Sequence, residues 1–401
     1  MTVSPRPLDG FKVIEMGQLI AGPFAGTLLA YFGAEVIKIE PPGNGDPLRG
    51  WRALDDDGTS FWWYSIGRNK KSVSINLRTD EGRAIAKDLI NSADVLIENF
   101  RPGTMEKWGL GPDTIKQTNP KLIYSRISGY GQTGPMANRP GFASVAEAFS
   151  GFRAINGFPD MPPVRPNLSM GDTMAGFHAA FGIILALVSR LRGQGEGQVV
   201  GVAIYESMFN IMEGIVPEYS GKGLVREPSG STLTGIVPTN TYLCNDGKYV
   251  VIGGNGDSIY KRLMRAAGYP EMADNPLMAD NAGRVKHQQE IDNAIGEWTA
   301  SHPSHTILQI LENADVPSGP IYDITDMMTC DQYRARNMFE SVDIGTTKPL
   351  EIPAIAPKLS ETPGRTDWPG QKVVGADTKT VLLDLGYDAA TIKTLQDNGI
   401  V

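Results

Sequence analysis

Apolar and polar positions along the first 220 residues alternate in a way that predicts short strands separated by helices. Lys12–Met16 and Glu35–Ile39 are apolar-rich segments of strand length, and Pro23–Phe32 between them has the apolar spacing of a helix. A further helix is predicted at residues 79–93, and further strands at residues 94–97, 121–127 and 198–204. This rhythm is typical of an α/β fold whose large, Rossmann-like domain has a mostly parallel sheet with helices on both faces.

The pattern changes after residue 220, where glycine, proline and serine dominate as far as Pro238. A hairpin is predicted next, because the turn sequence Asn245–Gly247 is flanked by apolar-rich runs. Helices are then predicted at residues 258–267, 285–301 and 304–314. We therefore expect three parts: a large α/β domain over residues 1–220, a smaller α+β domain over 221–330 and a C-terminal segment over 331–401.

Three glycine-bearing loops follow predicted strands of the large domain: Gly17–Gly22, Asn99–Gly103 and Ser128–Gly134. The carboxyl ends of parallel strands lie at one edge of a sheet, so we expect these loops to form one ligand site. The first loop does not fit the dinucleotide pattern G-x-G-x-x-G, although Glu40 stands where a ribose-binding acid is expected. A nicotinamide-dependent enzyme is therefore an alternative.

Asp172 precedes a stretch, Thr173–Ser189, that contains no Asp, Glu, Lys or Arg. The stretch is short for a membrane span and includes polar residues, which predicts a core helix beginning near Asp172. A carboxylate at a helix N-terminus is stabilised in its ionised form and can act as a nucleophile. The alternative is that Asp172 only caps the helix, as Asp commonly does.

The formal net charge of −8 argues against a general nucleic-acid or anionic-membrane surface, so a polyanionic ligand requires a local basic patch. Such a patch is predicted where four cationic residues fall close together: Arg68, Lys70, Lys71 and Arg78. The alternative for the first three is a solvated turn without a ligand.

Cysteine and histidine usage bears on location and metal binding. Only Cys244 and Cys330 are present and no N-terminal secretion signal is recognisable, so we expect a cytoplasmic protein. The four histidines match no metal-binding spacing, so no metal site is expected.

Five short segments occur in the order in which one enzyme family has them. They are Ala21–Pro23, Gly33–Glu40, Glu98–Gly103, Gly129–Pro135 and Met170–Thr173. With these segments the chain resembles the class III CoA-transferases, which include the formyl-CoA transferases and the carnitine CoA-transferases. The resemblance runs from about Leu8 to the C-terminus, and the end of the chain matches in general character only.

The resemblance implies an interlocked homodimer of ring-shaped subunits, in which the C-terminal segment returns to the large domain. It also implies that Asp172 attacks an acyl-CoA thioester to give an aspartyl anhydride and then an aspartyl-CoA thioester. Coenzyme A thioesters and a small carboxylic acid are then the substrates, and no tightly bound cofactor is expected.

A glycine-rich loop near the middle of the chain also resembles the family. It consists of Gly253, Gly254, Asn255 and Gly256, and the resemblance implies that it closes over the catalytic aspartate. Its backbone N–H groups are candidates to stabilise an oxyanion. The alternative is a plain turn before the helix predicted at residue 258.

Coenzyme A carries phosphates and an adenine ring, so its site requires cationic groups and an apolar slot. Matching motifs carry over nine candidate contacts: Gln18, Ile20, Ile75, Arg78, Asn99, Phe100, Lys107, Ser128 and Tyr130. Lys38 and Arg101 are further candidates. Gln18 stands where formyl-CoA transferases have His, and Ser128 where they have Lys, which disfavours formyl-CoA and oxalate as substrates.

The segment Arg165–Asp172 is more similar to family members that use succinyl-CoA with C4 to C5 dicarboxylates such as citramalate, mesaconate or itaconate. We therefore expect a CoA-transferase that acts on such an acid. Arg49, Arg139 and Arg165 are candidates to pair with the distal carboxylate. The alternative for each one is an ordinary structural arginine.

Two other functions stay open. The α-methylacyl-CoA racemases resemble this family but move a proton with a His and an Asp, and Phe142 stands where they have the His. Phenylalanine cannot accept a proton, so the racemase alternative lacks one of its two acid–base groups. The second alternative is a non-catalytic CoA-binding protein.

Overall fold

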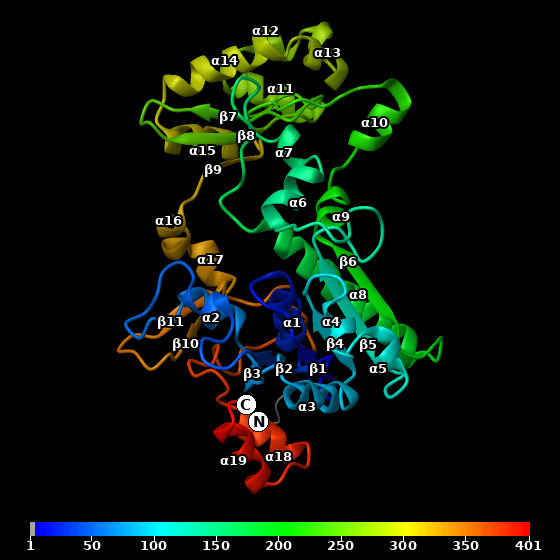
Figure 1. The fold of residues 1–401 in the computed structure, drawn as a ribbon. Helices are drawn as coiled ribbons and strands as arrows, with labels where there is room; N and C mark the ends of the chain where they lie inside the picture. Colours follow the sequence, from blue (N-terminus) through cyan, green and yellow to red (C-terminus); the bar gives the residue numbers. More distant parts are fainter. Residues whose placement is uncertain (1–4) are drawn as a thin grey trace. The chain divides into compact units, whose positions relative to one another are not determined.

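The computed structural model describes residues 5–401, which form two compact units (Figure 1). The large unit contains residues 5–152, 166–213 and 335–401, and the small unit contains residues 153–165 and 214–334. The large unit is therefore built from three separate stretches of the chain, the last of which is the C-terminal segment.

A six-stranded sheet with the order β3-β2-β1-β4-β5-β6 forms the centre of the large unit, and every neighbouring pair is parallel. The strands are β1 (Lys12–Glu15), β2 (Glu35–Glu40), β3 (Lys70–Ser74), β4 (Val95–Glu98), β5 (Ile123–Ser128) and β6 (Val199–Ala203). The expected α/β class with a parallel sheet is confirmed. The strand order reverses between β1 and β4, where doubly wound sheets bind their ligands.

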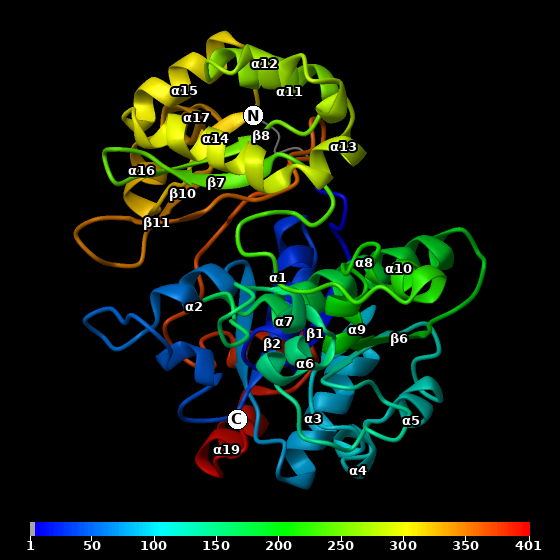
Figure 2. The same ribbon diagram turned by 90° about the horizontal axis from the view of Figure 1, so that it is seen from above.

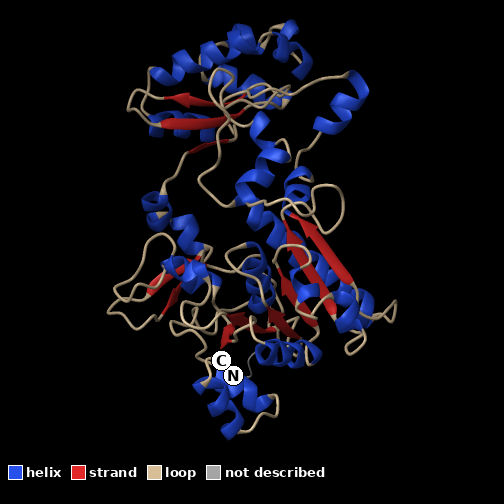
Figure 3. Cartoon of the chain, viewed as in Figure 1, coloured by secondary structure: helices blue, strands red, loops and turns tan. Residues whose placement is uncertain are grey.

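Helices cover both faces of this sheet, as Figures 2 and 3 show. The helices of the large unit are α1 (Ala21–Tyr31), η1 (Pro47–Gly50), α2 (Phe61–Ile66), α3 (Asp80–Asn91), α4 (Thr104–Lys107), α5 (Pro112–Lys116), α6 (Ala143–Phe149), α8 (Met170–Leu191), α9 (Ile204–Phe209), α18 (Thr378–Asp384) and α19 (Ala389–Asp397). Val13 and Ile14, adjacent on β1, are both buried because they face opposite core layers. Such strands are nearly continuous apolar runs, which is why the sequence pattern located them.

The two core layers differ in the helices that close them. Ile85 and Leu89 of α3 and Leu382 of α18 belong to one layer. Ala25 of α1 and Ile183 of α8 belong to the other, where small side chains let helix and sheet approach closely. The helix α8, which carries Asp172, is therefore part of the core on its inner side.

The C-terminal segment covers the outer edge of β3. The Ser72 N–H donates to a carboxylate oxygen of Asp377 at 2.8 Å, and the Ser74 N–H donates to the Thr378 hydroxyl at 2.9 Å. An uncovered edge strand is a template for unwanted pairing between chains, so these contacts protect the sheet. A short hairpin of β10 (Phe339–Val342) and β11 (Leu350–Pro353) lies earlier in the same segment.

The small unit has its own three-stranded antiparallel sheet of β7 (Thr239–Leu243), β8 (Tyr249–Gly253) and β9 (Ser318–Pro320). The predicted hairpin is confirmed as β7 and β8. The helix predicted at residues 285–301 is wrong in its start, because α13 ends at Lys286 and α14 begins at Gln288. The remaining helices of the chain are α7 (Phe152–Ile155), α10 (Ile215–Lys222), α11 (Asp257–Ala266), α12 (Pro270–Ala273), η2 (Pro276–Met278), α13 (Asn281–Lys286), α14 (Gln288–Ala300), α15 (Ser304–Asn313), α16 (Ile324–Thr329) and α17 (Asp331–Ala335).

The predicted basic patch is wrong, and so is its alternative of a solvated turn. The Arg68 side chain is buried and donates to the Ser65 and Pro353 carbonyls, both at 2.9 Å. Lys70 is buried on β3, and Lys71 pairs with Glu35 on the neighbouring strand at 2.5 Å. The sequence could not predict this burial, because Pro353, Glu15 and Glu35, which bind the three cations, are distant in the chain.

Lys70 belongs to a buried charge cluster of three carboxylates and three cations: Glu15, Lys38, Glu40, Asp46, Arg49 and Lys70. Each of these residues is at most 7% exposed. Lys38 Nζ lies 2.9 Å from Glu15 Oε1 and 2.8 Å from Asp46 Oδ2. Lys70 Nζ lies 2.7 Å from Glu15 Oε2, so one carboxylate serves two ammonium groups.

This cluster fixes the turn between β1 and α1. Lys38 Nζ donates to the Gly17 carbonyl at 2.8 Å, and the Leu19 N–H donates to Asp46 Oδ1 at 3.0 Å. Leu19 has a φ of 64°, which a residue with a side chain adopts only when its surroundings hold it there. The cluster supplies that constraint.

Glu15 and Lys38 stabilise each other's charged forms, whereas burial lowers the pKa of Lys70 to about 8. Burial raises the pKa of Glu15, yet Lys38 and Lys70 outweigh that effect, and the pKa lies below its ordinary value. Burial lowers the pKa of Lys38, yet Asp46 and Glu15 reverse the shift, and the pKa lies above its ordinary value. Both groups are therefore ionised at neutral pH.

Replacing Lys38 by methionine removes the ammonium group and keeps much of the side-chain length. We expect Lys38→Met to lower the free energy of unfolding by about 3 kcal/mol, because Glu15 and Asp46 lose a buried partner. Lys393→Met is the matched control, since the Lys393–Asp397 pair is exposed and its loss costs little. Urea unfolding followed by circular dichroism measures both; equal stability of the two variants contradicts the role of the cluster.

Candidate active site

A cavity of about 410 Å³ opens at the point where the strand order reverses, and we call it the Asp172 cavity. Its walls include the loops that follow three strands: Gln18–Ala21 after β1, Asn99–Pro102 after β4 and Ile127–Gly129 at the end of β5. The three loops therefore border one cavity, as expected. The remaining wall comes from Ala137, Arg139–Phe142, Asp172 and Ile204.

Asp172 is the third residue of α8 and lies in its first turn. The residue at the N-cap is Ser169, so the alternative in which Asp172 is the N-cap residue is wrong. The Asp172 side chain is half-buried and lines the cavity, beside the positive end of the helix dipole. That position favours the ionised carboxylate, which is the form that acts as a nucleophile.

Gly176 sets the approach of α8 to the β1–α1 turn. A Cβ atom at this position would lie 2.7 Å from the Ala21 carbonyl oxygen, closer than such atoms can pack, and at a tight 3.1 Å from the Phe24 ring. Glycine therefore allows α8 to contact the start of α1. Because Gly176 is one helical turn after Asp172, this contact places the carboxylate against the turn that Lys38 and Asp46 hold.

A second cavity of about 440 Å³ shares Gln18 and Phe100 with the first. Ile75, Arg78 and Trp108 line it. The rings of Trp108 and Phe100 pack edge to face, with their centroids 5.1 Å apart. The two cavities together bring seven of the nine predicted coenzyme A contacts to one edge of the sheet: Gln18, Ile20, Ile75, Arg78, Asn99, Phe100 and Ser128.

The other two predicted contacts lie outside both cavities. Lys107 is exposed at the end of α4. The Tyr130 ring packs against the rings of Phe149 and Tyr205, with ring centroids 5.3 and 6.2 Å apart, respectively. Lys38, a further candidate, is buried in the charge cluster, whereas Arg101 lines the Asp172 cavity.

Asn99 lines the cavity and also fixes the backbone of Gln18, another lining residue. The Gln18 N–H donates to Asn99 Oδ1 at 2.8 Å, and Asn99 Nδ2 donates back to the Gln18 carbonyl at 2.8 Å. This two-way bridge joins the loops after β1 and β4, across the point where the strand order reverses. Only the motif match pointed to Asn99, because nothing in its local sequence predicts the bridge.

The three candidate substrate arginines fall in different places. Arg139 is exposed and lines the Asp172 cavity. Arg49 is buried and makes two hydrogen bonds to Glu40, of 2.6 and 2.7 Å, beneath the Trp63 ring. Its geometry is that of a structural arginine. Arg165 belongs to the small unit and does not line the cavity.

The engagement of Glu40 disfavours the nicotinamide alternative. Its two carboxylate oxygens accept hydrogen bonds from Arg49, from the Asp46 N–H at 2.9 Å and from the Ser72 hydroxyl at 2.7 Å. A ribose-binding acid must offer its oxygens to the cofactor. Glu40 instead stabilises the protein interior.

The predicted glycine loop lies in the small unit, between β8 and α11. The Gly253 N–H donates to the Pro317 carbonyl and the Gly254 N–H donates to the Pro238 carbonyl, both at 2.9 Å. Buried Arg284 donates to the Asn255 carbonyl at 2.7 Å. The first two amides are therefore engaged within the unit, which leaves those of Asn255 and Gly256 as candidates to bind an oxyanion.

Sequence reasoning missed several residues of the cavity wall, above all Ala137, Pro140, Gly141 and Ile204. Their side chains carry no chemistry that a pattern can identify. The segment Pro140–Phe142 was noted only because Phe142 replaces a histidine. None of the four histidines lines the cavity, so within the described residues it offers no imidazole for a racemase.

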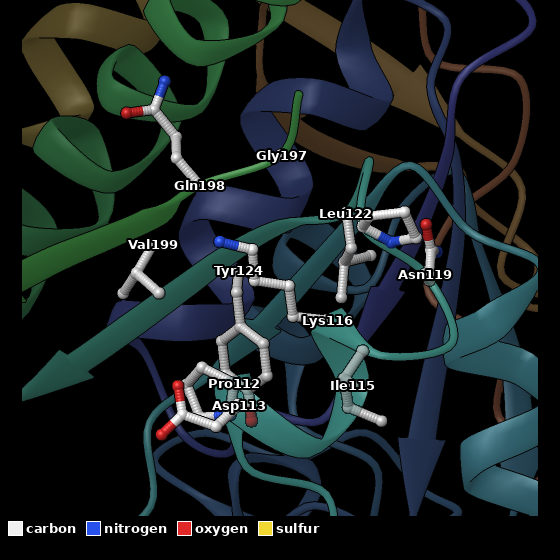
Figure 4. A pocket seen from close by; sticks show the side chains of 11 residues that line it. Pro112, Asp113, Ile115, Lys116, Asn119, Leu122, Tyr124, Gly197, Gln198 and Val199 are labelled. Carbon is white, nitrogen blue, oxygen red and sulfur yellow. The ribbon is translucent and has the colours of Figure 1, made fainter. Parts of the chain in front are cut away.

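A smaller cavity of about 150 Å³ lies at the other end of the sheet (Figure 4). Tyr124 near the start of β5 and Val199 at the start of β6 line it, along with Asp113 and Lys116 of α5. Ligands of such sheets bind at the carboxyl ends of the strands, and this cavity is at the amino ends. We therefore assign the site to the Asp172 cavity.

Within residues 5–401, no group of three or more His, Cys, Asp or Glu side chains is placed to hold a metal ion. In the same range one helix, α8, is long and apolar enough to cross a membrane when judged by length and composition. Its inner side packs on the core of the large unit, whereas its outer side exposes large apolar residues.

The chain is similar in sequence to known CoA-transferases. A sequence profile of "CoA-transferase family III" matches residues 8–378. The chain is 44% identical over 381 residues to the succinyl-CoA–D-citramalate CoA-transferase of Chloroflexus aurantiacus, covering 95% of this chain and 94% of that protein. It is 39% identical over 398 residues to the alpha subunit of the succinyl-CoA–L-malate CoA-transferase of the same organism, covering 98% and 92%.

A solved structure has the same fold. The crystal structure of a CAIB/BAIF family protein from Brucella suis matches with a TM-score of 0.84 and 29% identity, covering 95% of this chain and all of that one. Since the family profile spans most of the sequence and the relatives cover nearly all of it, the chain belongs to CoA-transferase family III.

Proposed function

We propose that this enzyme transfers coenzyme A from succinyl-CoA to a C4 to C5 dicarboxylic acid such as citramalate, mesaconate or itaconate. The observation that carries the proposal is the Asp172 carboxylate in a cavity shared by the three loops after β1, β4 and β5. The names of the two Chloroflexus aurantiacus relatives support the choice of succinyl-CoA and of a small dicarboxylate.

In the first half of the proposed reaction, an Asp172 oxygen attacks the thioester carbonyl of succinyl-CoA. The C–S bond breaks, and a mixed anhydride and the CoA thiolate form. The thiolate then attacks the Asp172 carbonyl, so that succinate leaves with one of the Asp172 oxygens and an aspartyl-CoA thioester remains. A carboxylate nucleophile suits this step because an anhydride keeps the acyl group activated.

The second half runs the same steps with the acceptor. An acceptor carboxylate oxygen attacks the aspartyl thioester and releases the thiolate, which gives a second anhydride. The thiolate then attacks the acceptor carbonyl, forms the product thioester and restores the Asp172 carboxylate. Water would hydrolyse both anhydrides, so the half-buried position of Asp172 supports the proposal.

Arg139 is the candidate within the Asp172 cavity for binding the distal carboxylate of a dicarboxylate. Its exposure leaves the guanidinium accessible to a ligand, whereas Arg49 is occupied by Glu40. A cytoplasmic location and the absence of a tightly bound cofactor are part of the proposal. The first is supported by two cysteines that form no disulfide.

A homodimer, interlocked as in the family resemblance, is also part of the proposal. The outer face of α8 exposes a stripe of apolar side chains, each 40 to 70% exposed: Phe177, Phe181, Ile184, Leu185, Val188 and Leu191. Their helical spacing puts them on one side, and apolar patches of this kind mark protein interfaces. We propose that a second copy of the chain covers them.

Asp172→Asn removes the nucleophile at nearly constant size. We expect CoA exchange between succinyl-CoA and a dicarboxylate to fall by more than about 10³-fold, because the anhydride can no longer form. Hydroxylamine added after succinyl-CoA should convert Asp172 of the unmodified enzyme to a hydroxamate, detected by mass spectrometry. Asp113→Asn, in the cavity of Figure 4, is the matched control and should leave both readouts unchanged. Full turnover by Asp172→Asn would refute the proposal.

Arg139→Gln removes the cationic group proposed to bind the acceptor. We expect kcat/KM for a dicarboxylate acceptor to fall about 10-fold or more, because a charged hydrogen bond is lost. The same quantity for a monocarboxylate of equal chain length serves as the internal control and should change little. An equal loss for both acceptors would remove Arg139 from the specificity site.

Placing a charge on the α8 stripe tests the homodimer. We expect the unmodified protein to be dimeric in light scattering and Phe181→Glu to shift it to monomer, because a desolvated carboxylate opposes association. Leu383→Glu on α18 is the control, since Leu383 is similarly exposed but outside the stripe. A dimer that persists in Phe181→Glu at all concentrations contradicts this interface.

A further inference from the structure

The N-terminus of α8 receives its cap from another helix. Ser169, at the N-cap, makes no capping hydrogen bond with its side chain. The Gly171 N–H instead donates to Oε1 of Glu147, on α6, at 3.1 Å. Glu147 is fully buried, with 0% of its surface exposed. The backbone group next to Asp172 is thus held by a carboxylate that lies far from it in the sequence.

The packing around Gly171 shows that this contact is built into the fold. A Cβ atom on Gly171 would lie 3.2 Å from Glu147 Cγ, 3.1 Å from Ile204 Cγ2 and 3.4 Å from the Ala143 carbonyl oxygen. The neighbours on α6 and α9 therefore close tightly on the first turn of α8. Ile204 also lines the Asp172 cavity, so this junction borders the site directly.

A buried carboxylate is an expensive way to cap a helix. Burial of a carboxyl group costs free energy unless hydrogen bonds offset that cost, and the Gly171 N–H supplies one such bond. A capping side chain at residue 169 would satisfy the same amide from within the helix. Unlike a cap from residue 169, the contact from Glu147 also connects the start of α8 to α6. The helix α6 directly follows Arg139–Phe142, which line the cavity.

We propose that Glu147 is a positioning residue: its carboxylate holds the first turn of α8 and thereby the direction in which Asp172 enters the cavity. The proposal rests on the proposed role of Asp172 as the nucleophile. Glu147 does not line either cavity, so it acts through the backbone of Gly171 and touches no substrate. A small misplacement of a nucleophile costs up to about 10²-fold in rate.

Two variants separate the hydrogen bond from the bulk of the side chain. Glu147→Leu removes the acceptor at similar size, and Glu147→Gln keeps an acceptor oxygen. For Glu147→Leu we expect kcat to fall by about 10- to 100-fold with an unchanged KM for succinyl-CoA. For Glu147→Gln we expect kcat close to that of the unmodified enzyme. Hydrogen–deuterium exchange should show loss of protection at Gly171–Thr173 in Glu147→Leu only.

A helix cap far from the site provides the control. Asp388 caps α19 by accepting from the Ala390 and Thr391 N–H groups, both at 2.9 Å. Asp388→Ala should lower the melting temperature and leave kcat unchanged, because it loosens a helix start that carries no site residue. The comparison separates a positioning effect from general loss of stability.

The results for the Glu147 variants distinguish a failure of the positioning role from a failure of the proposed function. Glu147→Leu with unchanged kcat and unchanged amide protection overturns the positioning role. If Glu147→Leu does not fold, Glu147→Gln decides: a loss of kcat beyond about 10-fold with intact protection shows that the charge matters and overturns the proposal. If the unmodified protein exchanges no CoA, the proposed function fails, while amide protection still tests the contact between Glu147 and Gly171.

Discussion

The buried charge cluster beneath the β1–α1 turn is the constraint on which the site depends. Three carboxylates and three cations form this cluster in the interior of the large unit, and removing Lys38 would leave the Asp46 carboxylate without its ammonium partner. Lys38 donates a hydrogen bond to the Gly17 carbonyl, and Asp46 accepts one from the Leu19 N–H. Arg49 donates to the Gln371 and Lys372 carbonyls, which secures the C-terminal segment to the same cluster.

Two further walls of the Asp172 cavity, the loop after β4 and the start of α8, connect to this turn. Asn99 bridges to Gln18, so the loop after β4 takes its position from the loop after β1. Gly176 lets α8 pack against Ala21, the first residue of α1, and so sets where the nucleophile lies. In the proposed reaction, two different acids in turn form an anhydride with Asp172. A rigid cavity suits this chemistry, because each anhydride must react with the CoA thiolate before water reaches it.

The sequence predicted the parts of the fold that depend on local pattern. Strands buried on both faces are rich in apolar residues, so β1, β2, β4 and β5 and the loops after three of them could be located. Lys70 could not be placed, because its partner Glu15 is 55 positions away and its own neighbours are polar. Glu147 escaped notice for the same reason, since its role follows from where α6 meets α8. Asp172 was identified by its motif, and its position in the cavity follows from the packing of α8.

The most direct test of the account follows oxygen atoms through one turnover. The enzyme is loaded with succinyl-CoA and then given an acceptor acid whose carboxylates carry oxygen-18, and the peptide that contains Asp172 is weighed. The account predicts that one labelled oxygen stays in the Asp172 carboxylate, because the bridging oxygen of the second anhydride comes from the acceptor. An unlabelled peptide, recovered while the labelled acceptor is converted to its CoA thioester, would contradict it.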